Sequence, residues 1–122
     1  MSNISIIIPV LDEAQNIASL HQACVAHLAD TSLDWEIIFV DDGSTDNTSE
    51  ILDEICSGDE RCRYLTLRRN YGQSAAIMAG LDQSDSPILV LMDGDGQNDP
   101  SDIPILVAKL EEGYDVVSGW RK

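Results

Sequence analysis

The chain has 122 residues, with 43% hydrophobic and 24% charged residues, which are ordinary values for one globular domain. Its formal net charge of −15 is unusually negative, so we expect it to repel nucleic acids and anionic lipid headgroups. No apolar run approaches the roughly 20 residues that a membrane-spanning helix needs, and the first residues lack the basic start of a signal peptide. These features predict a soluble, cytoplasmic chain.

The first half of the chain alternates between the apolar patterns of strands and helices. Ile4–Val10 is a nearly continuous β-branched run, typical of a strand that is covered on both faces. Helical spacing of apolar residues predicts a helix over about Ala14–Ala29, and Trp35–Val40 predicts a second strand. Asn47, followed three places later by Glu50, resembles a capping pair at the start of a second helix.

The second half continues the alternation with a strand, a helix of small residues and another strand, over Tyr64–Leu67, Ser74–Leu81 and Pro87–Met92. A further helix is expected to begin with a cap at Asp99 or Ser101 and to end at Gly113, before a fifth strand at Tyr114–Ser118. No repeat or linker interrupts the pattern. The order predicts an α/β fold with a mostly parallel, doubly wound sheet.

The three cysteines, Cys24, Cys56 and Cys62, match neither a CxxC pair nor a zinc-binding spacing. We expect free thiols with a structural role, as is usual in the cytosol. A redox or metal-binding role remains the alternative.

Unusual polar residues follow each of the first four predicted strands. They are Asp12 and Glu13, then Asp41 to Ser44, then Arg68 to Gln73, and finally Asp93 to Gln97. Because the carboxyl ends of parallel strands meet at one edge, we expect carboxylates to gather there beside an arginine pair. Such a group suits Mg²⁺ or Mn²⁺ together with a phosphorylated ligand. Each segment alone also fits an ordinary turn, helix cap or solvated rim.

Two other classes of nucleotide- or phosphate-handling domain fit less well. A phosphoacceptor receiver domain carries its acidic pair after the first strand, whereas Asp41 and Asp42 follow the second, and no lysine ends the last strand. A dinucleotide-binding Rossmann domain needs a GxGxxG motif after the first strand, which this sequence lacks there.

Five segments follow one another in the chain: IIIPVLDEAQNI, IIFVDDGSTDNT, LRRNYGQSAAIMAGLD, ILVLMDGDGQNDP and YDVVSGWR. Together and in this order they resemble the nucleotide-sugar-binding half of a family-2 glycosyltransferase with the GT-A fold. The stretches RNYGQSAAI and DGDGQNDP are most similar to the polyprenyl-phosphate sugar transferases, such as dolichyl-phosphate mannose synthase and its bacterial undecaprenyl-phosphate relatives.

For the nucleoside, the resemblance implies that Pro9, Leu11 and Glu13 line the pocket and that Asp41 accepts a hydrogen bond from the base. It gives Asp42 a substrate-binding role near the ribose, or a role in the turn of its own loop.

For the diphosphate, the resemblance implies that Asp93 and Asp95 form the DxD motif that carries Mg²⁺ or Mn²⁺, with Gln97 completing the metal shell. Asp95 and Arg121 are the expected catalytic residues, and Arg121 corresponds to an arginine that meets a phosphate. Asp93 also contributes to substrate binding through the bound cation.

The implied activity is an inverting transfer of a sugar from a UDP- or GDP-linked donor to a polyprenyl phosphate, for the cell envelope. An anionic lipid phosphate would need no protein base, whereas a sugar hydroxyl would need one. The parent protein is expected at the cytoplasmic face of the membrane. The alternative is a nucleotide-binding module without transferase activity.

Catalytic domains of the family continue well past the fifth strand. We therefore expect residues 1–122 to be the nucleotide-sugar-binding part of a domain truncated on its C-terminal side. Such a chain is expected to have little or no transferase activity, and its open edge favours a homo-oligomer.

Overall fold

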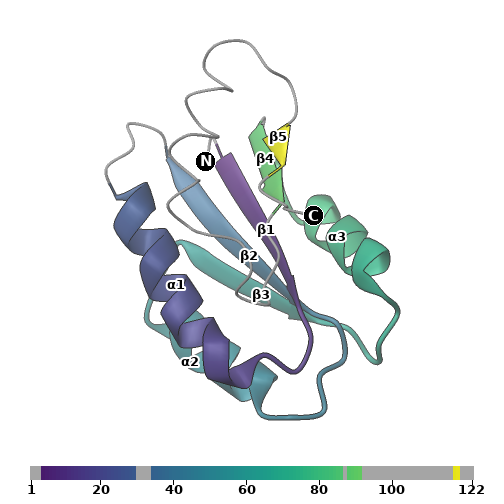
Figure 1. Cartoon of the computed structure of the whole chain (residues 1–122). Coiled ribbons are helices and arrows are strands. Elements are labelled where there is room, and N and C mark those ends of the chain that lie inside the picture. The colour runs from purple at the N-terminus through teal and green to yellow at the C-terminus, as the bar shows by residue number, and fades with distance from the viewer. Residues whose placement is uncertain (1–3, 30–33, 87, 92–116, 119–122) are drawn as a thin grey trace.

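A computed structural model describes residues 4–29, 34–86, 88–91 and 117–118 (Figure 1). The helix expected to begin at Asp99 or Ser101 lies outside these residues.

Within the described residues, five parallel strands form one sheet with the order β3-β2-β1-β4-β5. Their bounds are Ile4–Val10 for β1, Trp35–Asp41 for β2, Cys62–Thr66 for β3, Ile88–Leu91 for β4 and Val117–Ser118 for β5. The predicted α/β class with a mostly parallel sheet is confirmed.

The strand order distinguishes this sheet from that of a receiver domain. A flavodoxin-like or receiver sheet has the order 2-1-3-4-5, whereas 3-2-1-4-5 is the start of the doubly wound nucleotide-binding order. The chain moves outward from β1 to β3 on one side and then returns to place β4 on the other side of β1. The switch point therefore lies between β1 and β4, and ligands of such sheets bind outside the carboxyl ends of the strands at that point.

Helices cover both faces of the sheet. The helices α1 (Ala14–Leu28) and α2 (Thr48–Ser57) lie side by side on one face, and α3 (Gln73–Asp82) lies on the other (Figure 1). The larger core lies under α1 and α2 and includes Ile6, Ile8, Val10, Ile37, Phe39, Ile17, Cys24, Leu28 and Leu52, all of them buried. Alternate side chains of the central strands thus enter opposite cores, as expected for a sheet covered on both faces.

The core under α3 depends on small residues of this helix. Ala76 packs on Ile7, Ile38 and Val40. At Gly80, an added Cβ would lie 2.6 Å from Cγ2 of Ile7, so only a glycine allows this close approach. The prediction of a small-residue helix lying close to the sheet is confirmed.

The third strand lies slightly earlier in the chain than predicted. The prediction began at Tyr64, whereas β3 begins at Cys62, which pairs with Ile37. Because β3 is an edge strand, it alternates a buried Cys62 with an exposed Arg63, and the exposed arginine obscures the apolar pattern.

The predicted cap of α2 is only partly correct. Asn47 does occupy the N-cap position, but its side chain makes no capping hydrogen bond. Instead the Asp46 carboxylate accepts hydrogen bonds from the backbone N–H and the hydroxyl of Thr48. An aspartate one residue earlier therefore satisfies the start of this helix.

Candidate functional site

Three loops follow β1, β2 and β3 at the carboxyl ends of the strands. We call residues 11–13, 42–47 and 67–72 the carboxyl-edge loops; they lie together at the lower end of the molecule in Figure 1. Hydrogen bonds from backbone N–H groups to side-chain carboxylates join these loops to one another.

Asp12 ties the first loop to the second. Its φ of 51° is in the left-handed region, and one carboxylate oxygen, Oδ1, accepts hydrogen bonds from the N–H groups of Thr45 (2.7 Å) and Asp46 (3.3 Å). The Asp12 N–H donates in return to the Ser44 hydroxyl at 2.8 Å. This reciprocal pairing compensates the strained backbone of a non-glycine residue.

Asp42 ties the second loop to the third. The residue is only 4% exposed, and its two carboxylate oxygens accept the N–H groups of Tyr71 (2.9 Å) and Gly72 (3.0 Å). The charge of Asp42 is therefore already satisfied by backbone donors of the third loop. The expected roles of Asp42 were a place near the ribose or in the turn of its own loop, whereas the observed contacts are with a different loop.

Gly43 brings the same two loops into backbone contact. Its φ is +76°, and a Cβ built on it would lie 2.3 Å from the carbonyl carbon of Arg69 and 2.5 Å from the backbone nitrogen of Asn70. No side chain fits there, because backbone atoms cannot move aside as a flexible side chain can. Asp42 and Gly43 together fix the position of the loop before α3.

Asp41 differs from its neighbour in having an unused acceptor. It is fully buried, and its Oδ1 accepts the Ser44 N–H at 2.8 Å. Within the described part of the chain, Oδ2 is buried without any hydrogen-bond partner. A buried acceptor of this kind costs roughly 1–3 kcal/mol unless a ligand or water supplies a donor.

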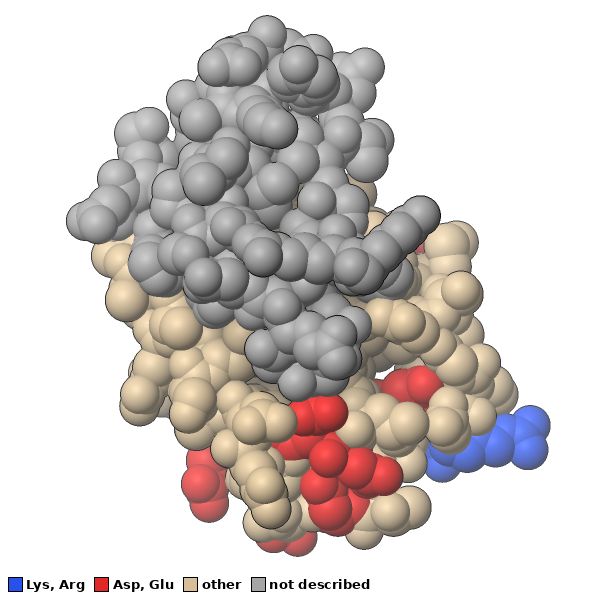
Figure 2. All heavy atoms as spheres, viewed as in Figure 1, with Lys and Arg blue, Asp and Glu red and all other residues tan. Residues whose placement is uncertain are grey.

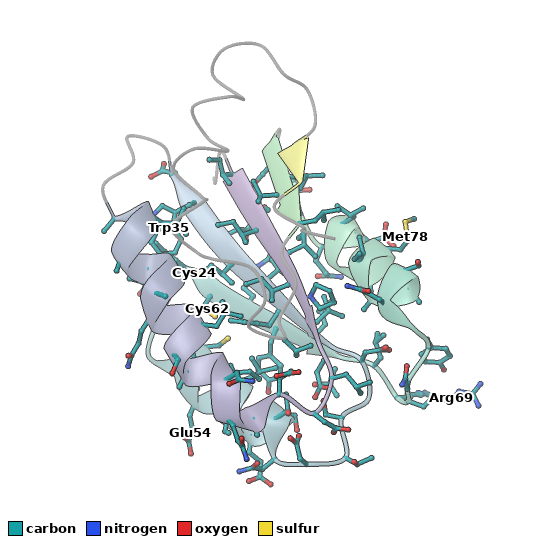
Figure 3. The ribbon with its side chains drawn as sticks, viewed as in Figure 1. Cys24, Trp35, Glu54, Cys62, Arg69 and Met78 are labelled. Atoms are coloured by element: carbon teal, nitrogen blue, oxygen red, sulfur yellow. The ribbon has the colours of Figure 1, made fainter. Side chains whose placement is uncertain are left out.

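Two large side chains near these acids are exposed. Leu11 is 38% exposed and Tyr71 is 52% exposed, and the Arg69 guanidinium lies 5.1 Å from the centre of the Tyr71 ring. Figure 3 shows Arg69 at the tip of the third loop, directed away from the sheet. An aliphatic side chain, an aromatic ring and a cation thus stand on the loops around the buried carboxylates.

Acidic side chains gather over the lower end of the described surface (Figure 2). Asp12 and Asp46, both exposed, belong to this region. The hydrogen bond from the Thr48 hydroxyl is the main cause that lowers the pKa of Asp46, so this carboxylate is charged at neutral pH. A cation, or a ligand carrying one, is the chemical complement of such a surface.

The other nucleoside-pocket residues expected from the sequence have structural contacts of their own. Pro9 is buried in β1, in register with Val40. Glu13 is the N-cap residue of α1, and its carboxylate accepts a hydrogen bond from the Asn16 side chain at 2.7 Å. The structure thus brings Pro9, Leu11, Glu13, Asp41 and Asp42 to one edge of the sheet.

The predicted diphosphate and metal residues, Asp93, Asp95, Gln97 and Arg121, lie outside the described residues. Among the residues that are described, no group of three or more His, Cys, Asp or Glu side chains is arranged to hold a metal ion. Carboxylate and amide oxygens, the donors offered by Asp93, Asp95 and Gln97, do suit Mg²⁺ and Mn²⁺. In the sequence, Asp93 comes two residues after the end of β4, the strand beside the switch point.

Sequence reasoning did not find the roles of Asp12 and Ser44, which join the first two loops. The signal was available in part, since Asp and Ser are frequent in turns because they bond to nearby backbone groups. Their partners, however, are more than 30 residues away in the chain, so no local pattern identifies them.

A family model described as "Glycosyl transferase family 2" matches residues 5–122. The chain belongs to this family. A similar protein, the undecaprenyl-phosphate 4-deoxy-4-formamido-L-arabinose transferase of Proteus mirabilis (strain HI4320), is 40% identical over 123 residues. The match covers 100% of this chain and 38% of the relative, so the chain spans less than half the length of the curated relative.

Solved structures share the fold. The glucosyl-3-phosphoglycerate synthase of Mycobacterium tuberculosis, in complex with UDP, is 28% identical with a TM-score of 0.71 and covers 92% of this chain and 41% of its own. The mannosyltransferase PcManGT from Pyrobaculum calidifontis, in complex with GDP-Man and Mn²⁺, is 18% identical with a TM-score of 0.70 and covers 88% and 32%. Both neighbours are glycosyltransferases, which confirms the predicted fold family.

None of the described helices combines the length and the apolar character needed to cross a membrane.

Proposed function

We propose that this chain is the nucleotide-sugar-binding part of a metal-dependent, inverting glycosyltransferase whose acceptor is a polyprenyl phosphate. The observation that carries the proposal is the buried Oδ2 of Asp41, an acceptor without a partner in the described part of the chain, at the carboxyl edge of the sheet. Membership of glycosyl transferase family 2 is consistent with a sugar donor at this edge.

Asp41 would recognise the nucleobase. Uracil and guanine both carry an N–H donor on the edge used for base pairing, so either base can supply the missing hydrogen bond. The exposed Leu11 and Tyr71 would flank the nucleoside, and Asp42 would act by holding the third loop in position. Pro9 and Glu13 would shape the pocket through β1 and the start of α1.

Asp93, Asp95 and Gln97 would hold Mg²⁺ or Mn²⁺, and the Mn²⁺ bound in PcManGT supports this choice. When bound, the cation would neutralise negative charge that develops on the departing nucleoside diphosphate. Arg121 would add a second positive charge at a phosphate. The remaining contribution of the chain is to orient the donor through Asp41 and the carboxyl-edge loops.

The proposed acceptor follows from the name of the Proteus mirabilis relative, which acts on undecaprenyl phosphate. A phosphate monoester is already anionic near neutral pH, so attack on the anomeric carbon from the face opposite the diphosphate would need no protein base. Inversion at that carbon would be the result. We place the whole protein at the cytoplasmic face of the membrane, where the nucleotide sugar and the lipid phosphate meet.

Residues 1–122 would then be a donor-binding part with little or no transferase activity of its own. A nucleotide-binding module without transferase activity is the second candidate. It is favoured by the same orphan acceptor, since Asp41 would bind a nucleotide in either case. A turnover assay on the full-length protein separates the two candidates.

Calorimetric titration of the chain with UDP and with GDP, in the presence and absence of Mn²⁺, tests the metal-dependent step. We expect Mn²⁺ to strengthen binding of one of the nucleotides and Asp95→Asn to abolish this gain. Asp82→Asn is the matched control, because it makes the same chemical change at an exposed position at the end of α3. Equal Mn²⁺ dependence in the Asp95→Asn variant and the original chain would contradict the proposed metal site.

A further inference from the structure

Cys56 and Cys62 lie next to each other, although their spacing in the sequence matches no known cysteine-pair motif. Their Sγ atoms are 3.1 Å apart, and both side chains are free thiols. A disulfide bond needs about 2.05 Å between the sulfur atoms, so a movement of about one ångström would join them.

The backbone between the two residues holds them in this arrangement. Cys56 is in the last turn of α2, and the chain then reverses through a short turn in which the Cys62 N–H donates to the Asp59 carbonyl at 3.1 Å. The Asp59 carboxylate accepts the Arg61 N–H at 2.9 Å and contacts the His21 ring of α1 at 2.8 Å. Cys62 itself is fixed as the first residue of β3, in register with Ile37. The close contact of the thiols therefore follows from a fixed turn.

The two thiols differ in their surroundings. Cys62 is buried at 4% exposure, whereas Cys56 is partly exposed. The hydrogen bond from Cys62 is the main cause that lowers the pKa of Cys56, although burial and the nearby Asp59 and Asp53 oppose it. The same hydrogen bond, with burial, raises the pKa of Cys62. A partly exposed cysteine with a lowered pKa beside a buried thiol with a raised pKa is the arrangement of an attacking and a resolving cysteine.

We propose that Cys56 and Cys62 are a redox-active pair that a peroxide-class oxidant converts into an intramolecular disulfide. The Cys56 thiolate attacks one peroxide oxygen; the O–O bond breaks, and Cys56 becomes a sulfenic acid while hydroxide leaves and takes a proton. The Cys62 sulfur then attacks the Cys56 sulfur, and the sulfenic oxygen leaves as water with the Cys62 proton. Two thiols and one hydrogen peroxide thus give one disulfide and two waters, with two electrons passing from sulfur to oxygen.

This site is independent of the proposed nucleotide site. Cys62 is at the amino end of β3, whereas the carboxyl-edge loops follow its other end at Thr66. The free-thiol prediction for the cysteines describes the reduced state, and the redox alternative fits the two neighbours but not Cys24. Cys24 is fully buried, and burial raises its pKa to about 12, so it is a natural internal reference.

The test is to treat dilute folded chain with hydrogen peroxide, remove the oxidant, and label the remaining thiols with a maleimide in denaturant. The untreated chain should take up three labels, one for each cysteine, and the oxidised chain should take up only the label on Cys24. Peptide mapping should find a Cys56–Cys62 linkage that dithiothreitol reverses. The Cys24→Ser variant should form the same linkage.

The Cys56→Ser variant should lose the disulfide, and Cys62 should then keep its label under the same peroxide dose. Three results would overturn the proposal: full labelling of Cys56 and Cys62 after peroxide, a linkage that involves Cys24, or conversion of Cys56 to a sulfinic acid while Cys62 stays free. Failure of nucleotide binding would leave this result untouched, since no nucleotide is present.

Discussion

The two ends of the sheet both carry buried polar side chains, but they treat them differently. At the amino end, five residues form what we call the amino-edge cluster: Ser5, Glu36, Arg63, Ser84 and Ser86. The buried Ser5 hydroxyl hydrogen bonds with Glu36 (2.6 Å), Ser84 (2.6 Å) and Ser86 (2.7 Å). The Arg63 guanidinium completes the cluster by pairing with Glu36 at 2.8 Å.

At the carboxyl end, one buried polar atom has no hydrogen-bond partner among the described residues. Asp12 and Asp42 are satisfied by backbone N–H groups, but Oδ2 of Asp41 is buried without a partner in the described residues. In the amino-edge cluster, the buried Ser5 hydroxyl has hydrogen-bond partners within the chain, and these bonds join the strands to the loop before β4. The Asp41 oxygen at the end of β2, which lacks such a partner among the described residues, instead indicates a position where a ligand could donate a hydrogen bond.

The largest effect on stability should come from Gly43→Ala at the carboxyl end. A positive φ costs about 1–2 kcal/mol for an L residue, and the clash with the Arg69 backbone adds about 1–3 kcal/mol. We therefore expect a loss of about 2–5 kcal/mol in the free energy of unfolding, measured by urea denaturation. Gly58→Ala is the matched control. A Cβ added at Gly58 would lie 3.8 Å from its nearest neighbour, the Ile55 carbonyl oxygen, and the φ of Gly58 is −98°. Similar losses in both variants would contradict the close contact between the loops.

Asp42→Ala should have the next largest effect. It leaves the N–H groups of Tyr71 and Gly72 without their carboxylate, and hydrogen bonds to a charged group contribute about 1.5–3 kcal/mol. We expect faster amide hydrogen exchange at these two residues and weaker nucleotide binding together. Unchanged exchange at both amides would show that the carboxylate does not hold the third loop.

Ser5→Ala tests the amino-edge cluster. It removes the hydrogen bond that the Ser5 hydroxyl donates to Glu36, and we expect the free energy of unfolding to fall by about 1–2 kcal/mol. Nucleotide affinity should stay the same, because the cluster lies at the other end of the sheet. A loss of affinity without a loss of stability would mean that the two ends are not separate in function.

The smallest effect concerns Asp59 and pH. Burial alone would raise the pKa of Asp59, but the hydrogen bond from the Arg61 N–H and the contact with His21 outweigh it and lower the pKa. A carboxylate with a lowered folded pKa stabilises the protein above its unfolded pKa of about 3.9, and the contribution disappears as the pH falls through the folded value. Because the site is largely solvated, we expect less than about 1 kcal/mol.

Unfolding of Asp59→Asn at pH 7, 5 and 3 measures this contribution. The variant should be slightly less stable than the original chain at pH 7 and 5, and the difference should shrink toward pH 3. A difference that grows in acid would reverse the sign assigned here.

Much of the fold could be predicted because its signals are local. Ile4–Val10 is recognisable as a central strand from its β-branched run, and the glycine at position 80 belongs to a visibly small-residue helix. The edge strand β3 was harder, since Arg63 points to solvent and breaks the apolar run.

The different hydrogen-bond partners of Asp41 and Asp42 could not be predicted from the sequence pattern alone. The two residues are chemically identical neighbours. The fold shows that Asp42 accepts hydrogen bonds from a loop 29 and 30 residues away, while one oxygen of Asp41 has no partner among the described residues. Which carboxylate is open depends on long-range contacts, and the sequence alone does not determine them locally.

The most direct test of the central claim is Asp41→Asn in a calorimetric titration with UDP and GDP in the presence of Mn²⁺. The amide keeps the oxygen that accepts the Ser44 N–H but replaces the open acceptor by a donor. We predict that affinity for the bound nucleotide falls at least about tenfold, since a hydrogen bond to a charged group contributes about 1.5–3 kcal/mol, while the free energy of unfolding does not decrease. Affinity equal to that of the Asp82→Asn control would contradict the claim, as would an original chain that binds neither nucleotide.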